Sequence, residues 1–358
     1  MLEKKRYEFL ERLLSKPSPV GYEAEGQRVW LNDMQKIADR TETDAYGSAA
    51  AFLDVNPDAP TLMLEAHCDE IGMIVQHIDE SGFVYLNRLG GSDPAIARAR
   101  RVTIHSRKGQ VTGIIGHTAI HLQDKNGSNK TPGWKDLFVD LGVSSKDEAL
   151  ELIQIGDPVT YVDQHEMLND DKLIGRALDN RIGGFIIAEA FRNLAERKDK
   201  LEVNVVALNA VQEEIGGFGA RMMSYRIHPS AALITDVTHA TDSPGINQKE
   251  HGSVKLTEGP VVTHGAGAHP VLTRKVEDVA SQKEIEIQHE AAGSRTGTDT
   301  DSIYHQKTGI PCALISLPLR YMHSPVEMVS IEDVHKVSEL MAETICSCKN
   351  TDRYGVLD

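Results

Sequence analysis

The sequence predicts an α/β protein with a mostly parallel β-sheet flanked by helices, interrupted once by a small β-rich domain. From about residue 166, short apolar runs typical of buried strands alternate with segments of helical periodicity. A strand of the same apolar type, "APTLMLEAH", lies far upstream at residues 59–67. Between these regions, residues 71–165 alternate apolar and polar positions and show little helical periodicity. We therefore expect a main domain formed by residues 1–70 and 166–358, with residues 71–165 inserted as a small β-barrel-like domain.

The elements of the main domain can be assigned in chain order. The N-terminal segment "MLEKKRYEFLERLL" has apolar residues at helical spacing, and Pro17 and Pro19 end that helix. Its apolar positions are Leu2, Phe9, Leu10, Leu13 and Leu14. After the insert we expect the helix "RIGGFIIAEAFRNLAER", the strand "EVNVVALNAV", the helix "GFGARMMSYRI" and the strands "AALITD", "EIEIQHE" and "PCALISLPL". The last helix, "SIEDVHKVSELMAETICSC", begins after Ser330, whose hydroxyl can cap it. Near-continuous Val, Ile and Leu strands between helices indicate a sheet covered on both faces.

The sequence of the insert predicts one hairpin and one helical stretch. "RVTIHSRKGQVTGIIG" reads as a hairpin with its turn at Lys108 and Gly109, and "SSKDEALEL" is the one helical stretch.

Composition excludes several classes of function. The 358 residues contain 38 Lys and Arg against 53 Asp and Glu, a formal net charge of −15, which repels nucleic-acid backbones and anionic membrane surfaces. No run of about 18 apolar residues occurs, and Glu8, Glu11 and Arg12 interrupt the N-terminal apolar positions, so neither a membrane span nor a signal peptide is expected. We therefore expect a cytoplasmic protein. The four cysteines, too few and irregular for a disulfide framework, are Cys68, Cys312, Cys346 and Cys348.

The candidate functional residues are polar side chains that follow apolar strands. Ligands of an open α/β sheet bind beyond the carboxyl ends of its strands, so these positions are expected to meet. They come from "TLMLEAHCDEIG", "GRALDNRIGG", "VVALNAVQEEIGG", "AALITDVTHA" and "ISLPLRYMHSPVE". The side chains are His67, Asp69, Asp179, Glu213, Glu214, Asp236 and His323.

The spacing of these residues favours metal binding. His67 and Asp69 point the same way from an extended segment, so the carboxylate can orient the imidazole. Adjacent Glu213 and Glu214 repel each other unless a cation neutralises them, and their diverging side chains allow one to bind metal while the other accepts a proton. Taken singly, Asp179 and Asp236 could be turn residues, the glutamates a solvated loop and His323 a loop residue. Together, two histidines and at least three carboxylates suffice for two zinc-like or cobalt-like ions that share a bridging carboxylate.

The segments that carry these residues resemble the M42 family of metallo-aminopeptidases, which includes glutamyl aminopeptidases, tetrahedral aminopeptidases and proteins formerly labelled endoglucanases. The matching segments, in family order, are "EAHCDEIG", "IGRALDNRIGG", "VQEEIGGFGA", "LITDVTHA" and "YMHSPVE", with "GDPVTY" closing the insert. The resemblance implies a zinc-peptidase type of α/β fold over essentially the whole chain. It also implies that the inserted domain pairs subunits into dimers, which can assemble into hollow dodecamers.

The resemblance also implies a role for each residue. Asp179 would bridge two divalent ions, His67 and Asp236 would complete one site, and Glu214 and His323 the other. Glu213 would be the general base acting on a metal-bridging water, with Asp69 behind His67. A cis peptide bond is expected after Asp179. The segments 263–270 and 296–303 could shape the substrate pocket or be ordinary loops.

The expected activity is therefore dinuclear metal-dependent removal of N-terminal residues from peptides, most readily with Zn or Co. Three alternatives remain open. The same chemistry would serve an N-deacylase of small amides. A glycoside hydrolase acting through Glu213 and Glu214 is disfavoured because adjacent residues are poorly placed for carboxyl groups about 5–10 Å apart. A non-catalytic assembly subunit would have no use for the complete ligand set.

Overall fold

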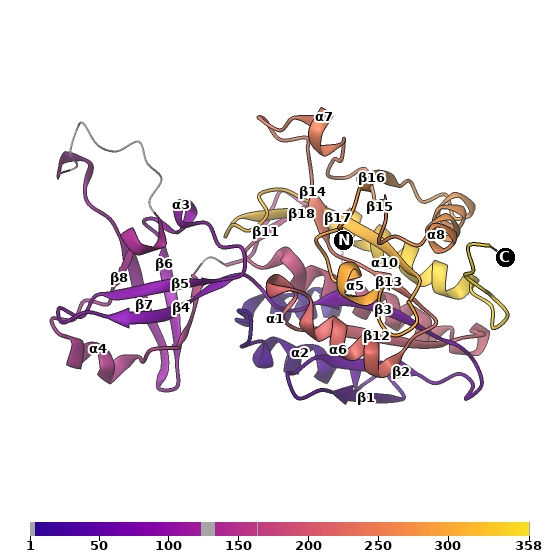
Figure 1. Cartoon of the computed structure of the whole chain (residues 1–358), viewed down its shortest axis with the longest axis horizontal. Helices are drawn as coiled ribbons and strands as arrows, with labels where there is room; N and C mark the ends of the chain where they lie inside the picture. Colours follow the sequence, from indigo (N-terminus) through magenta and orange to yellow (C-terminus); the bar gives the residue numbers. More distant parts are fainter. Residues whose placement is uncertain (1–3, 123–132, 163, 358) are drawn as a thin grey trace.

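The computed structural model describes residues 4–122, 133–162 and 164–357. Two parts are visible, a larger α/β part and a separate barrel to one side of it (Figure 1). The α/β part is built on a nine-stranded sheet with the order β1-β2-β12-β3-β13-β17-β15-β16, and β14 pairs with β17. Its central strands β12, β3, β13 and β17 are parallel to one another. The predicted fold class, a mostly parallel sheet flanked by helices with a small barrel, is confirmed.

The strands of this sheet have the following bounds: β1 Arg40–Thr43, β2 Ala49–Leu53, β3 Thr61–His67, β12 Asn204–Ala210, β13 Ala231–Ile234, β14 Val237–His239, β15 Val261–Gly265, β16 Gln288–Ala292 and β17 Cys312–Leu319. Strand β16 starts at Gln288, so the expectation of a strand from Glu284 was wrong at its beginning. Glu284 has a positive φ of 56° and ends the turn after α8, and therefore cannot continue an extended strand.

The register of the central strands determines which residues meet at the edge of the sheet. His67, the last residue of β3, pairs with Ala210, so the chain that follows β12 continues beside it. Ile234 of β13 pairs with Glu65, which places Asp236 level with His67 on the other side.

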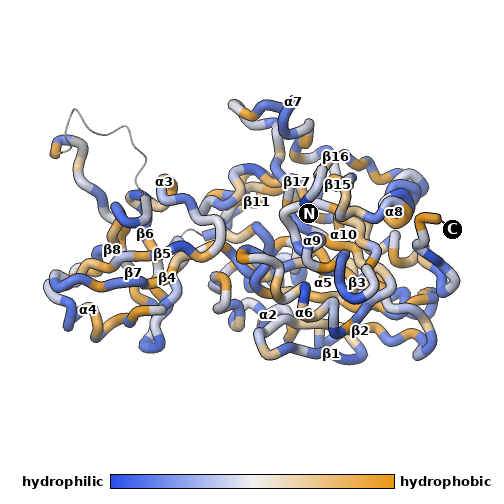
Figure 2. The backbone as a smooth tube through the Cα atoms, in the orientation of Figure 1, coloured by the Kyte–Doolittle hydropathy of each residue, from blue (hydrophilic) through white to orange (hydrophobic). Residues whose placement is uncertain are grey.

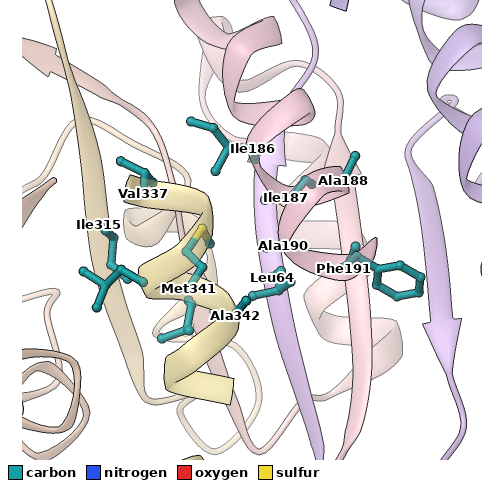
Figure 3. Packing of buried hydrophobic residues seen from close by; sticks show 14 of the residues in the cluster. Leu64, Ile186, Ile187, Ala188, Ala190, Phe191, Ile315, Val337, Met341 and Ala342 are labelled. Atoms are coloured by element: carbon teal, nitrogen blue, oxygen red, sulfur yellow. The ribbon is translucent and has the colours of Figure 1, made fainter. Parts of the chain in front are cut away.

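Helices cover both faces of the sheet. One face carries α1 Lys4–Ser15, α2 Ala24–Met34, α5 Leu178–Glu196, α8 Pro270–Gln282 and α10 Ile331–Ser347, and the other carries α6 Phe218–Ile227 and α9 Thr300–Ile303. Figure 3 shows Ile187 of α5 and Met341 of α10 in the same core as Leu64 of β3 and Ile315 of β17.

The two predicted terminal helices are present. In α1 the buried residues are Phe9, Leu10, Leu13 and Leu14, whereas Leu2 lies outside the described residues. The hydroxyl of Ser330 caps α10 by accepting a hydrogen bond from the main-chain N–H of Asp333.

The barrel is closed by six strands in the order β4-β5-β8-β7-β6-β9. Their bounds are β4 Gly72–Ile78, β5 Val84–Leu89, β6 Arg101–Ser106, β7 Gly109–Gly116, β8 Phe138–Asp140 and β9 Pro158–Tyr161. The short helices α3 Pro94–Ala97 and α4 Lys146–Leu152 accompany them. Hydrophobic and hydrophilic stretches alternate along these strands (Figure 2), and the barrel has its own core, which includes Met73, Val102 and Val139. The hairpin expected at Lys108 and Gly109 joins β6 to β7.

A small antiparallel sheet consists of β10 Glu166–Leu168, β11 Lys172–Gly175 and β18 Glu327–Ser330. Glu327 pairs with Gly175, so this sheet holds Glu327 close to the start of α5. A further short helix, α7 Gln248–His251, projects from the α/β part (Figure 1). In the described part of the chain, no helix is long and apolar enough to cross a membrane.

Candidate metal centre

The seven predicted residues meet at the carboxyl ends of the central strands. Six of them line one cavity of about 460 Å³: His67, Asp179, Glu213, Glu214, Asp236 and His323. Asp69 is completely buried behind His67, with its Oδ1 atom 3.4 Å from Nδ1 of that histidine. The structure therefore brings all seven side chains together.

The carboxylate of Asp179 faces two separate groups of possible ligands. Its Oδ1 atom lies 3.3 Å from Nε2 of His67, which in turn lies 3.6 Å from Oδ1 of Asp236. Its Oδ2 atom lies 3.3 Å from Nε2 of His323, which lies 3.5 Å from Oε1 of Glu214. Each group offers one nitrogen and two carboxylate oxygens within 4.8 Å of one another. Asp179 is the member that both groups share.

The chain holds Asp179 in place through the beginning of α5. The peptide bond between Asp179 and Asn180 is cis, as the sequence resemblance implied. The Asn180 side chain donates a hydrogen bond to the carbonyl of Thr235 over 3.1 Å and accepts one from the N–H of Gly183 over 3.0 Å. The first bond connects the start of α5 to the residue before Asp236, and the second lies within the first turns of α5.

Asp69 organises the neighbouring loop. Its two carboxylate oxygens accept hydrogen bonds from the main-chain N–H groups of Glu213 and Glu214, at 3.0 and 3.1 Å. The same carboxylate lies beside His67. Asp69 therefore orients the histidine and the two glutamates together.

The electrostatics of the site indicate that a cation belongs there. Burial and the neighbouring carboxylates of Asp299 and Asp236 raise the pKa of Glu213 to about 10, although His67 opposes this. Burial also raises the pKa of Glu214 to about 7. Its Oε1 atom is buried and accepts no hydrogen bond within the described residues. Buried carboxylates that are costly to ionise alone fit a site whose negative charge a divalent ion neutralises.

The pKa values of His323 and Asp179 reflect the attraction between the histidines and the carboxylates. Burial lowers the pKa of His323, but Asp179 and Glu214 outweigh it and raise that pKa to about 11. Burial would raise the pKa of Asp179, yet hydrogen bonds from His323 and His67 bring it below its usual range. The nitrogens and oxygens that would face a metal thus attract one another where they converge.

Three features of the site were not expected from the sequence. Glu327 accepts hydrogen bonds from the main-chain N–H groups of Asp179 and His323, at 3.0 and 2.9 Å. Gly91, which belongs to the predicted insert, lines the cavity against the ring of His323. Below His67, the carboxyl groups of Glu65 and Asp299 are buried side by side. Glu327 lies in the segment "YMHSPVE", but only its pairing with β11 shows that it reaches α5.

Of the two loop segments suggested for the pocket, one contributes to its wall. Thr296, Gly297, Thr298, Asp301 and Ser302 line the cavity. Residues 263–270 are not among the described residues that line it. Gly267 instead lies behind that wall, where an added Cβ would come within 3.5 Å of Asp301 Oδ1.

Comparison with known proteins identifies the family. The family model for M42 glutamyl aminopeptidase matches residues 47–340. The chain belongs to the M42 peptidase family. It is therefore an aminopeptidase, and the family is metal-dependent, in agreement with the two ligand groups.

The M42 resemblance extends over nearly the full chain. The chain is 32% identical to the lysyl aminopeptidase of Pyrococcus furiosus, over 97% of this chain and 98% of that protein. An aminopeptidase from Desulfurococcus kamchatkensis superposes with a TM-score of 0.89 at 30% identity, covering 97% of each chain. The TET1 peptidase of Pyrococcus horikoshii, described as able to form a tetrahedron or a large octahedral shell, superposes with a TM-score of 0.84 at 29% identity, covering 96% of this chain and 100% of that one.

Proposed function

We propose that this M42 peptidase uses two divalent metal ions, Zn or Co, to remove N-terminal residues from peptides. The observation that carries the proposal is the position of Asp179, one of whose oxygens faces His67 while the other faces His323. A carboxylate in this position suits the sharing of one residue between two ions. His67 and Asp236 would hold one ion with Asp179, and Glu214 and His323 the other.

The metal ions would acidify a water molecule and polarise the scissile carbonyl. The protein supplies the proton transfers. Glu213 lines the same cavity, has its Oε2 atom 3.9 Å from Nε2 of His67, and belongs to neither ligand group. As general base, Glu213 takes the proton of the attacking water and then delivers it to the leaving amine. Asp69 contributes by holding the main chain of Glu213 and the ring of His67 in place.

We further propose that the chain forms a dimer-based homo-oligomer of up to twelve subunits in the cytoplasm, with the barrel of residues 71–165 as the dimerisation domain. The support is the closed, independently packed barrel and the shell-forming TET1 relative. Light scattering coupled to size exclusion would measure the mass. Wild-type protein that remains monomeric when fully loaded with metal would contradict this part of the proposal.

Metal content and hydrolysis measured on one sample test the catalytic proposal. We expect about two divalent ions per centre and chelator-sensitive release of one or a few amino acids from an aminoacyl-p-nitroanilide panel. Two ions without release from peptides or anilides, combined with hydrolysis of small N-acyl amides, would favour the deacylase alternative. Failure to bind metal after reconstitution would contradict the dinuclear centre.

A further inference from the structure

A third group of metal-ligating side chains lies at the outer edge of the main sheet. His264 is near the end of β15, His289 is on the edge strand β16, and Glu277 is on α8. None of these three described residues lines the cavity of the candidate metal centre. They therefore form a separate cluster.

The fold explains why these side chains converge. His289 pairs with Val262 across the parallel strands β15 and β16, and paired residues project from the same face of a sheet. His264 follows Val262 by two residues and so projects from that face as well. Val262 is buried in the core that also contains Val276 of α8, and Glu277 is the next residue of that helix. Both imidazoles thus face the helix that carries the carboxylate.

The distances within the cluster suit a small divalent ion. Nε2 of His264 lies 3.1 Å from Nδ1 of His289 and 3.3 Å from Oε1 of Glu277, and the last two atoms are 3.6 Å apart. The point equidistant from all three atoms is about 1.9 Å from each. An ion displaced slightly from their plane would reach the Zn–N and Zn–O distances of about 2.0–2.2 Å.

Hydrogen bonds among the three side chains satisfy these three atoms less well than a bound cation would. If Nε2 of His264 donates its proton to Nδ1 of His289, that second nitrogen is an acceptor and has no proton to offer Glu277. The carboxylate oxygen then faces a lone pair at 3.6 Å. A cation accepts electron pairs from all three atoms at once.

We propose that His264, Glu277 and His289 form a third metal site, which binds a Zn²⁺-like ion separately from the catalytic centre. Two imidazole nitrogens and one carboxylate select borderline ions such as Zn²⁺ over Mg²⁺ or Ca²⁺, which prefer oxygen ligands. The side chains of His264 and His289 are 46% and 54% exposed, so water has access to the fourth coordination position. The ion would join β15, the edge strand β16 and α8.

Zinc binding by wild-type and variant proteins tests this proposal. The experiment uses the full-length protein, equilibrated by dialysis against buffered free Zn²⁺ and analysed for metal per chain. The variant H264A/H289A is expected to bind one Zn²⁺ fewer than wild type and to hydrolyse aminoacyl-p-nitroanilides at an unchanged rate. Glu277→Gln, which preserves the shape of the side chain, should bind the same ion more weakly. Added Zn²⁺ should raise the Tm of wild type more than that of H264A/H289A, because an ion that binds only the folded state stabilises it.

The matched control is E250Q/H251A, which alters an exposed Glu–His pair that belongs to none of the three ligand groups in the described residues. This control should bind as much Zn²⁺ as wild type. Equal zinc content in wild type and H264A/H289A would overturn the proposal. It would also be overturned if H264A/H289A lost hydrolysis and bound at least two Zn²⁺ fewer than wild type. The comparison counts a difference of one ion, so it is independent of how many ions the catalytic centre holds.

Discussion

Oε2 of Glu327 accepts a hydrogen bond from the main-chain N–H of Asp179 over 3.0 Å, and this bond ties strand β18 to the start of α5. The other oxygen of Glu327 accepts from the N–H of His323. Glu327 is almost completely buried, and it holds one proposed ligand shared by both ions and one ligand of the second ion. We therefore expect Glu327 to support metal binding indirectly, through the main-chain positions of Asp179 and His323.

We expect Glu327→Ala to lower metal affinity about 10- to 100-fold, the usual effect of losing a group that orients ligands. Glu327→Gln keeps one oxygen acceptor and should lose less. Competition with a chromophoric chelator measures both affinities. Glu250→Ala, on the exposed helix α7, is the control and should leave them unchanged. Wild-type affinity in Glu327→Ala would show that Asp179 and His323 do not need this support.

Glu213 and Glu214 are adjacent, and the proposal gives them different roles. Glu213→Gln should retain both metal ions and lose about 10²- to 10⁴-fold in kcat, because the amide cannot accept the proton. Glu214→Gln should instead lose metal from the group that includes His323. Metal analysis and hydrolysis rates on both variants distinguish the roles. A near-normal rate in Glu213→Gln would exclude it as the general base.

The glycine at position 91 allows the His323 ring to lie against the chain. A Cβ added there would come within 2.4 Å of Nδ1 of His323, closer than real contacts permit. The His323 side chain is 34% exposed and can move outward. We expect Gly91→Ala to weaken binding of the second ion and reduce kcat, as measured by metal titration and initial rates. Gly293→Ala is the control because an added Cβ there meets nothing within 4 Å. Identical behaviour of the two variants would refute the proposed clash.

Glu70 is buried between two arginines, and its loss should affect stability more than catalysis. Its carboxylate forms ion pairs with Arg176 and Arg181, and Arg181 also donates hydrogen bonds to the carbonyls of Leu13 and Leu14. Glu70→Ala would leave the Arg181 guanidinium buried without its partner, at a cost of about 3–5 kcal/mol in unfolding free energy. Urea denaturation measures the change. The control Glu25→Ala removes an exposed ion pair with Lys16 and should cost at most about 1 kcal/mol.

The stability contribution of Glu70 should also depend on pH. Burial raises the pKa of this carboxyl, but Arg176 and Arg181 outweigh it and lower the pKa below its usual 4.5. A group with a lowered folded pKa stabilises the protein above its unfolded pKa and loses that contribution as the pH falls through the folded pKa. The difference between wild type and Glu70→Ala should therefore be complete near pH 7 and shrink below about pH 4.5. A difference that grows in acid would contradict this assignment.

The strands that could be predicted from the sequence are buried on both faces, and their sequences are therefore continuous apolar runs. "TLMLEAH", "VVALNA" and "CALISLPL" are of this kind, and their parallel arrangement explains why the residues after them meet. Strand β2 is also apolar and buried throughout, but its Ala-rich sequence has low strand propensity. Its neighbour β1 is polar and partly exposed and carries no apolar run. Strand β2 forms because it pairs with β12, and β1 forms because it pairs with β2, so both depend on tertiary pairing.

In the candidate site, too, some residues could be predicted from local sequence and others depend on tertiary contacts. His67, Asp179 and the residues that join them follow recognisable strands or motifs. Glu327 and Gly91 act through the pairing of β18 with β11 and through the approach of the insert to His323. Both relationships join segments far apart in the chain, so local patterns carry no trace of them.

The order of the ligands along the chain has a consequence for biosynthesis. Strands β3, β12, β13 and β17 become neighbours only through crossover connections, and such non-local pairings form slowly. His67, Asp179 and Asp236 have all been synthesised well before β17, whereas His323 follows it. A ribosome-bound chain would thus present the first group of proposed ligands while the second is still incomplete, and the second proposed ion could bind only after His323 has been synthesised.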